Sequence, residues 1–143
     1  MKVSFMISPE YTPPYAVIYA DKLTDEIRRA AELFDEKQPV TGYHGDRLMI
    51  LKPEDIYMVR IEGGDTTIYC EKEQYRSKKR LYEISAQLGS GFMQISKSTL
   101  VNLSYLDSTS AGLGGTVQLK LKNGCTDYIS RKYLPVFKKY LGL

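Results

Sequence analysis

The fold of this chain is decided by residues 91–103, which read Gly-Phe-Met-Gln-Ile-Ser-Lys-Ser-Thr-Leu-Val-Asn-Leu. Two β-prone pieces, Phe92–Ile95 and Leu100–Leu103, flank a polar break, a pattern that predicts two short strands. Lys97 lies inside the break among serine and threonine hydroxyls. A lysine can donate to guanine O6 and N7, and hydroxyls can donate to phosphates. Spacing alone nevertheless favours an ordinary solvated turn, because Ser/Thr-rich turns are common.

Downstream of this stretch the pattern continues as short strands, expected at Leu106–Thr109, Thr116–Leu121 and Thr126–Ile129. Asn123-Gly124 separates the last two and is a strong signal for a two-residue hairpin turn. Gly112-Leu113-Gly114-Gly115 precedes a strand rather than a helix and lacks the GK[ST] ending of a phosphate loop. We therefore expect a flexible turn there.

A final helix is expected after Ser130, a plausible N-cap, with Leu134, Phe137 and Leu141 facing inward. Pro135 suggests that the regular hydrogen bonding of this helix begins late. Arg131-Lys132 would stand at its N-terminal end, where two cations oppose the helix dipole. Cations in such a place hint at an external anion.

Upstream of the central stretch, strands are expected at Leu48–Leu51, Asp55–Ile61 and Thr66–Cys70, the last two joined by the turn Gly63-Gly64-Asp65. The segment Ser77–Leu88 carries Leu81, Ile84 and Leu88 on one face and three basic residues elsewhere. It predicts a basic amphipathic helix that Gly89 closes.

The N-terminal region has a different character. Lys2–Ile7 and Tyr15–Ala20 are β-prone, and apolar residues from Leu23 to Phe34 recur at helical spacing, which predicts an amphipathic helix ending near Asp35. Gln38-Pro39 and Thr41-Gly42 read as a linker. We therefore expect a small β-β-α appendage over residues 1–40, too short to hold a core alone, and a main domain over residues 41–143. The fold class is mainly β, a β-rich α+β protein.

Charge is distributed unevenly along the chain. Residues 1–71 hold 8 Lys and Arg against 13 Asp and Glu, whereas residues 72–143 hold 12 against 4. The second half is therefore strongly basic, which points to an anionic partner such as a nucleic acid or a membrane surface. A solvated basic face on an ordinary protein is the alternative, and charge alone does not separate the two.

Catalysis and metal chemistry have little support. The single histidine, His44, lies in a loop beside a glycine, and no paired carboxylates or metal-ligand spacings stand out. Cys70 and Cys125 are expected to be reduced, with a redox switch between them as the minor alternative. We expect no enzyme activity, no cofactor and no metal. With no signal peptide and no long apolar run, a cytoplasmic location is the default.

Taken together, three segments resemble the LytTR family of bacterial DNA-binding domains. Residues 91–103 resemble its signature, commonly F-x-R-[IV]-[HS]-[RK]-S-x-[LIV]-V-N. Residues 117–134, which contain the Asn-Gly turn and then Ile129-Ser130-Arg131-Lys132-Tyr133, resemble its strand–NG–strand–[VI]-S-R-[RK]-[YH] ending. Asp55-Ile56-Tyr57-Met58-Val59 resembles its D-I-x-Y-[IV] pattern. The resemblance covers about residues 45–141, and the ordered combination is far more specific than any one motif.

The resemblance implies an elongated, mostly antiparallel β-domain that sends loops into successive major grooves of bent double-stranded DNA. Gln94 and Ser96 stand where many members carry Arg and His, which leaves phosphate contacts at these two positions open. Arg60 stands where Glu is frequent, so the first loop can be oriented differently. Asn102 is expected to be structural, tying a strand end to a neighbouring loop. The implied DNA-binding residues are Lys97, Lys132, Arg131, Thr66, Ser96, Ser98, Gln94 and Asp65.

The resemblance also bears on partners. Many members of this response-regulator-like family carry a phosphorylation receiver domain of about 100 residues. Such a domain cannot fit before residue 45, so the chain resembles the stand-alone members of the family. Such members imply a homodimer on paired sites and a co-encoded small membrane protein that restrains the regulator. The function that the resemblance implies is that of a sequence-specific DNA-binding transcription regulator. The rival hypothesis is a protein-interaction module that docks to an acidic or membrane-bound partner through the basic helix at Ser77–Leu88 and the appendage over residues 1–38.

Overall fold

A computed structural model describes residues 1–34 and 38–143 of the chain. The chain divides into two compact units, Met1–Glu36 and Lys37–Leu143. The helix end that the sequence predicts near Asp35 lies outside the described residues.

The first unit contains one helix, α1 (Asp25–Phe34), and the expected strands at Lys2–Ile7 and Tyr15–Ala20 are wrong, because residues 1–34 contain no strand. The periodicity of both segments suits a strand, but strands need hydrogen-bonded partners, and a lone two-stranded hairpin is marginal in water. The three prolines between the segments also lack the N–H that a ladder requires. The β-β-α description of this unit is therefore corrected to coil followed by one helix.

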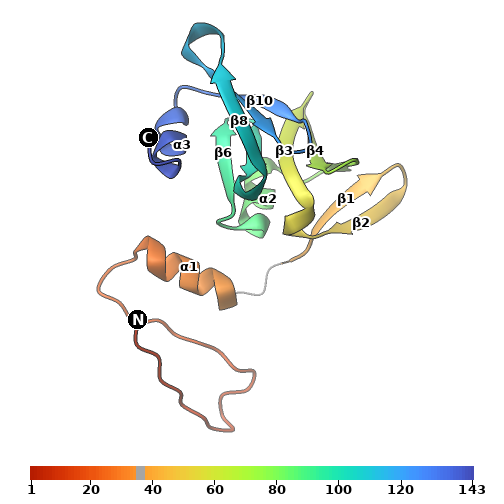
Figure 1. Cartoon of the computed structure of the whole chain (residues 1–143). Helices are drawn as coiled ribbons and strands as arrows, with labels where there is room; N and C mark the ends of the chain where they lie inside the picture. Colours follow the sequence, from red (N-terminus) through yellow and green to blue (C-terminus); the bar gives the residue numbers. More distant parts are fainter. Residues whose placement is uncertain (35–37) are drawn as a thin grey trace. The chain divides into compact units, whose positions relative to one another are not determined.

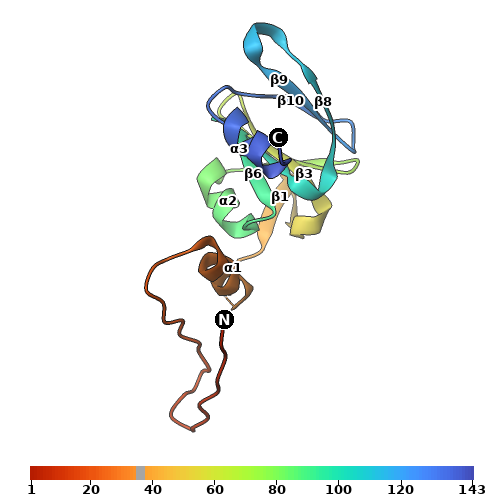
Figure 2. The same ribbon diagram turned by 60° about the vertical axis from the view of Figure 1, so that its left-hand side comes forward.

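The second unit is built from two antiparallel sheets (Figures 1 and 2). One has seven strands in the order β2-β1-β5-β4-β3-β7-β6, and the other has three in the order β10-β9-β8. The strands are β1 (Val40–His44), β2 (Arg47–Leu51), β3 (Ile56–Glu62), β4 (Asp65–Cys70), β5 (Gln74–Ser77), β6 (Phe92–Ser96), β7 (Thr99–Asn102), β8 (Leu106–Ala111), β9 (Val117–Leu121) and β10 (Thr126–Ile129). The expected mainly β, antiparallel fold class is confirmed for this unit.

Two strands of the large sheet were not anticipated. β1 replaces the linker expected at Thr41-Gly42, and Gly42 serves close packing, since a Cβ there would lie 2.6 Å from the Tyr75 Cβ. β5 consists of polar and aromatic residues without alternation, yet it pairs with β4 from Thr66↔Ser77 to Tyr69↔Gln74. Neither strand alternates apolar and polar residues in its sequence, although both pair with a neighbour along the chain: β1 with β2 across the two-residue turn Gly45-Asp46, and β5 with β4 across residues 71–73.

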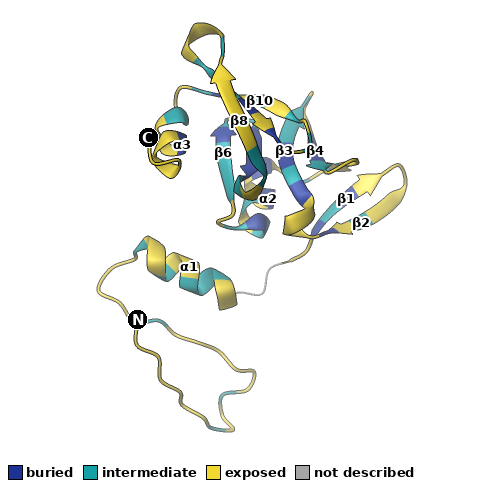
Figure 3. Cartoon of the chain, in the orientation of Figure 1, coloured by how far each residue is buried: buried dark blue, intermediate teal, exposed yellow. Residues whose placement is uncertain are grey.

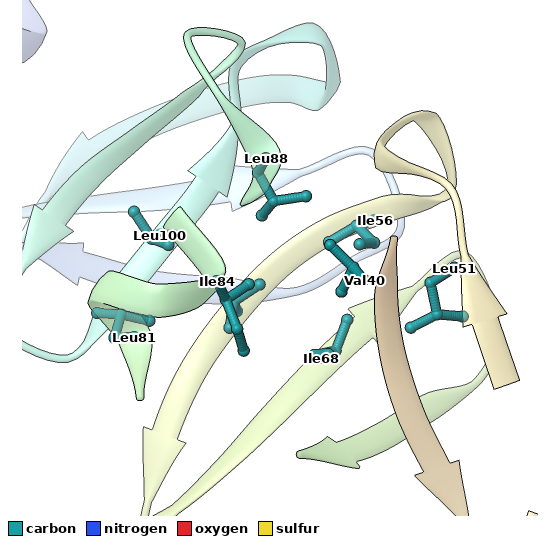
Figure 4. Close-up of a cluster of buried hydrophobic side chains, with 9 residues drawn as sticks. Val40, Leu51, Ile56, Ile68, Leu81, Ile84, Leu88 and Leu100 are labelled. Carbon is teal, nitrogen blue, oxygen red and sulfur yellow. The ribbon is translucent and has the colours of Figure 1, made fainter. Parts of the chain in front are cut away.

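The central strands of the large sheet are buried on both faces, whereas β2 and β5 are largely exposed. One face packs on α2 (Leu81–Leu88) through a cluster that includes Ile56, Val59, Ile68 and Leu100 (Figure 4). The other face packs on the small sheet and α3 (Leu134–Tyr140), with Ile95 fully buried. Successive side chains of a strand point to opposite faces, so neighbours such as Leu100 and Val101 enter different clusters. This explains the nearly continuous apolar runs of β3 and β7.

The basic helix expected at Ser77–Leu88 is wrong in its first four residues. Ser77 ends β5, its Oγ accepts from Lys79 N at 3.1 Å, and α2 begins only at Leu81. The Glu83 carboxylate accepts from Arg80 N at 3.1 Å and helps to cap the helix. The basic residues therefore lie in the turn before α2, and α2 itself contains no Lys or Arg.

The final helix begins late, as Pro135 predicts: α3 starts at Leu134, one residue before the proline. The expected N-cap, Ser130, is wrong, because Tyr133 holds that position and Ser130 contributes only its carbonyl to the preceding turn. Phe137 is buried as expected, whereas Leu141 is exposed just beyond the end of the helix.

Candidate nucleic-acid interface

Two tight turns lie at the same end of the large sheet. Gly63 and Gly64, with φ of 58° and 87°, join β3 to β4, and Lys97-Ser98 join β6 to β7. The turns are adjacent because β3 pairs with β7, and Ile61 N donates to the Ser98 carbonyl at 2.9 Å. β5 also ends here, since Ser77 pairs with Thr66, so Lys78, Lys79 and Arg80 follow at this end.

The turn that carries Lys97 is braced from within. Ser98 N donates to Ser96 Oγ at 3.3 Å, and the two serine hydroxyls lie 3.4 Å apart. The pairing of β6 with β7 shifts between Gln94 and Ser96, which makes Ile95 the extra residue of a β-bulge. Bulges increase the local twist and change the direction of nearby side chains. Lys97 is thus an exposed side chain on an ordered support.

The bulge also fixes the segment before α3. Ser130 N donates to the Ile95 carbonyl at 2.9 Å, which anchors the start of the turn Arg131-Lys132-Tyr133 close to Lys97. Lys132 is exposed, with its Nζ 5.6 Å from the centre of the Tyr133 ring. Two lysines that are 35 positions apart in the sequence are therefore presented by adjoining turns.

Arg131 is exposed but engaged. Its guanidinium donates to the Gly114 carbonyl in the loop between β8 and β9. A Cβ at Gly115, where φ is 81°, would lie 3.2 Å from Arg131 Nη2, so this glycine allows the guanidinium to lie against the loop. A guanidinium has five donors, and Arg131 retains some for a second acceptor.

Beneath the turns, a polar network joins the two sheets around Arg60. Its Nε donates to Glu62 at 2.8 Å, and its Nη2 donates to the Tyr69 hydroxyl at 3.0 Å. Its Nη1 reaches the small sheet, donating to the Thr126 carbonyl at 3.3 Å and lying 3.5 Å from the Asp127 carboxylate. Arg60 is therefore a structural link between the two sheets.

The network also fixes charge states. The hydrogen bond from the Tyr69 hydroxyl, reinforced by Arg60, holds the pKa of Glu62 below its ordinary value despite partial burial. Burial opposes the charge on Arg60, but the hydrogen bonds to Glu62 and Tyr69 outweigh it and raise the pKa of Arg60. Both groups stay ionised near neutral pH and compensate each other.

Charges are segregated along the strand direction. At the turn end the acids Glu62 and Asp65 face cations, Glu62 at 2.7 Å from Arg60 and Asp65 at 3.5 Å from Arg76. Six further cations there form what we call the basic end: Lys78, Lys79, Arg80, Lys97, Arg131 and Lys132. The opposite end of the same strands carries Glu54, Asp55, Glu71 and Glu73. A polyanion would therefore be attracted to one end of the sheet and repelled from the other.

A groove of about 830 Å³ opens beside the basic end. It lies between the β1–β2 hairpin and the end of β5, and its lining includes His44, Arg76 and Lys78. His44 is exposed, as expected for a surface residue, with its ring 3.8 Å from the Glu73 carboxylate. The sequence did not predict this groove, because neither β1 nor β5 was expected. The signal that could have revealed β1 is Gly45-Asp46, the two-residue turn that joins it to β2.

The remaining candidates differ in accessibility. Gln94 is half-buried on β6, and Asp65 is exposed at the start of β4. Thr66 is only 3% exposed, and its hydroxyl donates to the Lys79 carbonyl at 2.7 Å. Thr66 therefore holds the basic turn in place and does not present its side chain to a partner.

Asn102 is structural, as the sequence suggested. Its buried side-chain amide donates to the Ile56 carbonyl at 2.8 Å, and its oxygen accepts from Ser104 N at 3.0 Å. These bonds tie the end of β7 to the start of β3, far from the basic end.

The two cysteines are unpaired and half-buried. Burial, with a smaller effect of Asp55, raises the pKa of the Cys70 thiol to about 11, and burial also raises the pKa of Cys125. A thiol that stays protonated at neutral pH is a poor nucleophile. This gives no support to a redox switch.

Comparison with known proteins gives consistent results. The LytTr DNA-binding domain family matches residues 46–142. Two relatives from Staphylococcus aureus, of strains MSSA476 and MRSA252, are each named an uncharacterized HTH-type transcriptional regulator. They are 28% and 27% identical over 146 residues, covering 100% of this chain and 99% of theirs. A LytTr DNA-binding domain from Bacillus cereus has a similar fold, with a TM-score of 0.68, 22% identity, and coverage of 76% of this chain and 100% of that one. Among the described helices, none is long and apolar enough to cross a membrane.

Proposed function

This chain belongs to the LytTR family of DNA-binding domains, and from this we propose that it is a sequence-specific transcription regulator. The observation that carries the proposal is the basic end, where cations from three separate segments gather on ordered turns of a LytTR fold. The regulator names of relatives that match over the whole chain support the same conclusion.

We assign different roles to the cations of the basic end. Lys97 and Lys132 stand on exposed turns and are proposed to read base edges in the major groove, with Arg131 beside them. Ser96, Ser98 and Gln94 flank Lys97 and are proposed to contact phosphates, and Asp65 to orient the neighbouring turn. Insertion of adjoining loops into successive grooves would bend the DNA. Thr66 is left out, because its side chain is buried and its hydroxyl is occupied.

The reading elements are turns and strand ends, not a helix-turn-helix. A helix-turn-helix needs two helices joined by a short turn, with the second in the major groove. In the second unit, α2 and α3 are separated by five strands within the described residues. The name of the Staphylococcus aureus relatives, HTH-type transcriptional regulator, therefore fits the proposed function of this chain but not its DNA-binding motif.

The partners follow from this role. We propose a homodimer on paired sites, a cytoplasmic location together with the DNA, and restraint by a small co-encoded membrane protein. The alternative is an interaction module that docks to an acidic or membrane-bound partner through a basic helix at Ser77–Leu88 and through residues 1–38. The part of this argument that concerns the helix loses its support, since α2 starts at Leu81 and carries no cation.

The proposal predicts a strong dependence of DNA binding on salt. Removal of one lysine that neutralises a phosphate should reduce the slope of log K against log salt by roughly 0.9, so Lys78→Ala with Lys79→Ala should reduce it by up to about 2. Lys138 and Lys139, which are exposed in the last turn of α3, are further candidates for phosphate contacts. If they bind phosphates, Lys138→Ala with Lys139→Ala should reduce the slope by a similar amount. Gel shifts at several salt concentrations measure the slope.

Lys72→Ala is the matched control. Lys72 is exposed like Lys78 but precedes β5 instead of following it, so it lies at the acidic end of the sheet. Its removal should leave the slope unchanged. A flat salt dependence of the unsubstituted protein would refute the electrostatic basis of the proposal.

A further inference from the structure

The first unit exposes an unusual amount of apolar surface. Its exposed side chains include Phe5 at 87% and Ile7 at 95%, and α1 buries none of its residues (Figure 3). The large apolar side chains exposed in residues 1–34 are Met1, Val3, Phe5, Met6, Ile7, Tyr15, Val17, Tyr19, Leu23, Leu33 and Phe34. A soluble protein rarely leaves such a collection uncovered unless something binds there.

The spacing of these residues along the sequence indicates which kind of partner can bury them. Val3, Phe5 and Ile7 alternate along one segment, and Tyr15, Val17 and Tyr19 alternate along the next. Alternation with period two suits a strand with one apolar face, yet neither segment forms a strand in the single chain. What both segments lack is a neighbouring strand, which another chain can supply.

The available area is sufficient for a stable dimer. If each of the eleven side chains buried only about 100 Å², below the roughly 150–250 Å² of a full aromatic residue, one copy would bury about 1,100 Å². A standard specific interface needs about 800 Å² from each partner.

The charges on α1 are self-complementary. Arg28 and Glu32 lie along the same edge of the apolar face formed by Ile27, Ala30 and Ala31. If two copies of α1 cross antiparallel at Ala30, Arg28 of each copy lies opposite Glu32 of the other. Like edges meet in antiparallel helix pairs, so both ion pairs form by symmetry.

We propose that residues 1–34 are the interface through which two copies of this chain form a homodimer, with the apolar segments ordered by pairing between copies. This interface rests on the proposed function in one respect, because it is the interface of the homodimer that is expected to bind paired DNA sites. The dimer forms without DNA, so the interface and the DNA-binding function can be refuted separately.

The first experiment is sedimentation of the full chain without DNA over a range of concentrations. The unsubstituted protein should have twice the mass of one chain. Phe5→Asp with Ile7→Asp should raise the dimer dissociation constant at least about a hundredfold, because each buried side chain of this size is worth roughly a factor of ten or more and occurs twice. Leu113→Asp is the control: Leu113 is 90% exposed in the other unit, and its variant should remain dimeric.

Charge reversal provides a test that misfolding cannot mimic. Arg28→Glu alone and Glu32→Arg alone should each weaken the dimer about three- to tenfold, because like charges then face each other twice. An equimolar mixture of these two variants should recover the original affinity, since both intermolecular pairs are restored while the pairs within each helix are not.

A full chain that stays monomeric at high concentration would overturn the inference, and so would a dimer that Phe5→Asp with Ile7→Asp leaves intact. Sedimentation of the monomer with phospholipid vesicles would identify a lipid surface as the occupant instead. Affinity for DNA bearing a single site should be unchanged in the Phe5→Asp/Ile7→Asp variant. If this variant lost affinity for single-site DNA as well, residues 1–34 would contribute to DNA binding. That result would count against the assignment of DNA binding to the basic end and not against the dimer interface.

Discussion

Ile95→Ala is expected to lower the free energy of unfolding by about 2–5 kcal/mol, because it removes buried apolar atoms and leaves a cavity in the core. Ile95 is 0% exposed and packs in the cluster between the two sheets and α3. Ile95→Val should cost only about 0.5–1.5 kcal/mol. Urea unfolding followed by circular dichroism gives both values.

The control for this substitution is Ile50→Ala. Ile50 is the same residue type on edge strand β2 but is 72% exposed, so its removal should change stability by less than about 0.5 kcal/mol. Equal effects at positions 95 and 50 would show that the cluster at Ile95 is not a core. Ile95 also supports the proposed DNA-binding surface, because its carbonyl accepts from Ser130 N in the segment that leads to Lys132.

Lys97→Ala is expected to weaken binding to the cognate DNA site by roughly 5- to 150-fold, which corresponds to about 1–3 kcal/mol for the removal of one base-reading side chain. Binding to unrelated DNA should weaken far less, because phosphate contacts dominate there. Lys132→Ala should also weaken binding to the cognate site more than binding to unrelated DNA. Gel shifts on cognate and scrambled duplexes at one salt concentration separate the two effects.

Lys72→Ala removes the same charge at the acidic end and should leave both affinities unchanged. Unaltered cognate affinity in Lys97→Ala would remove Lys97 from the set of base-reading residues. An equal decrease in affinity on cognate and scrambled DNA would instead make Lys97 a phosphate-binding residue.

Features that depend on local chemistry could be predicted from the sequence. Gly63-Gly64 and Asn123-Gly124 mark hairpin turns, since positive φ favours glycine at positions 63, 64 and 124, and the structure has a turn at both places. The second turn is longer than the two residues expected, because β9 ends at Leu121 and β10 begins only at Thr126. The late start of α3 follows from Pro135. The strands around these turns were correct to within one or two residues.

Features whose sequence lacks a clear apolar alternation could not be predicted in this way. The strand at Gln74–Ser77 has no such alternation and is defined by its pairing with β4 across residues 71–73, and the true start of α2 is set by this strand. The opposite error occurred at Lys2–Ile7, where strand periodicity is present but the described residues, 1–34 and 38–143, supply no strand partner.

The candidate site shows the same division. The resemblance singled out Lys97, Arg131 and Lys132, and the structure brings their turns together through the Ser130–Ile95 hydrogen bond. It could not tell that Thr66 points inward, because its partner is a backbone carbonyl 13 residues away. Nor could it assign Arg60 to a network that reaches Asp127 in the other sheet.

The central claim, that this chain reads DNA sequence through its basic end, is tested most directly by selection of bound duplexes from a random pool with the full chain. The expected result is enrichment of a defined motif that occurs as paired half-sites, with no preference at one position of each half-site in the Lys97→Ala protein. Binding that enriches no motif would contradict the claim and leave only a nonspecific basic surface.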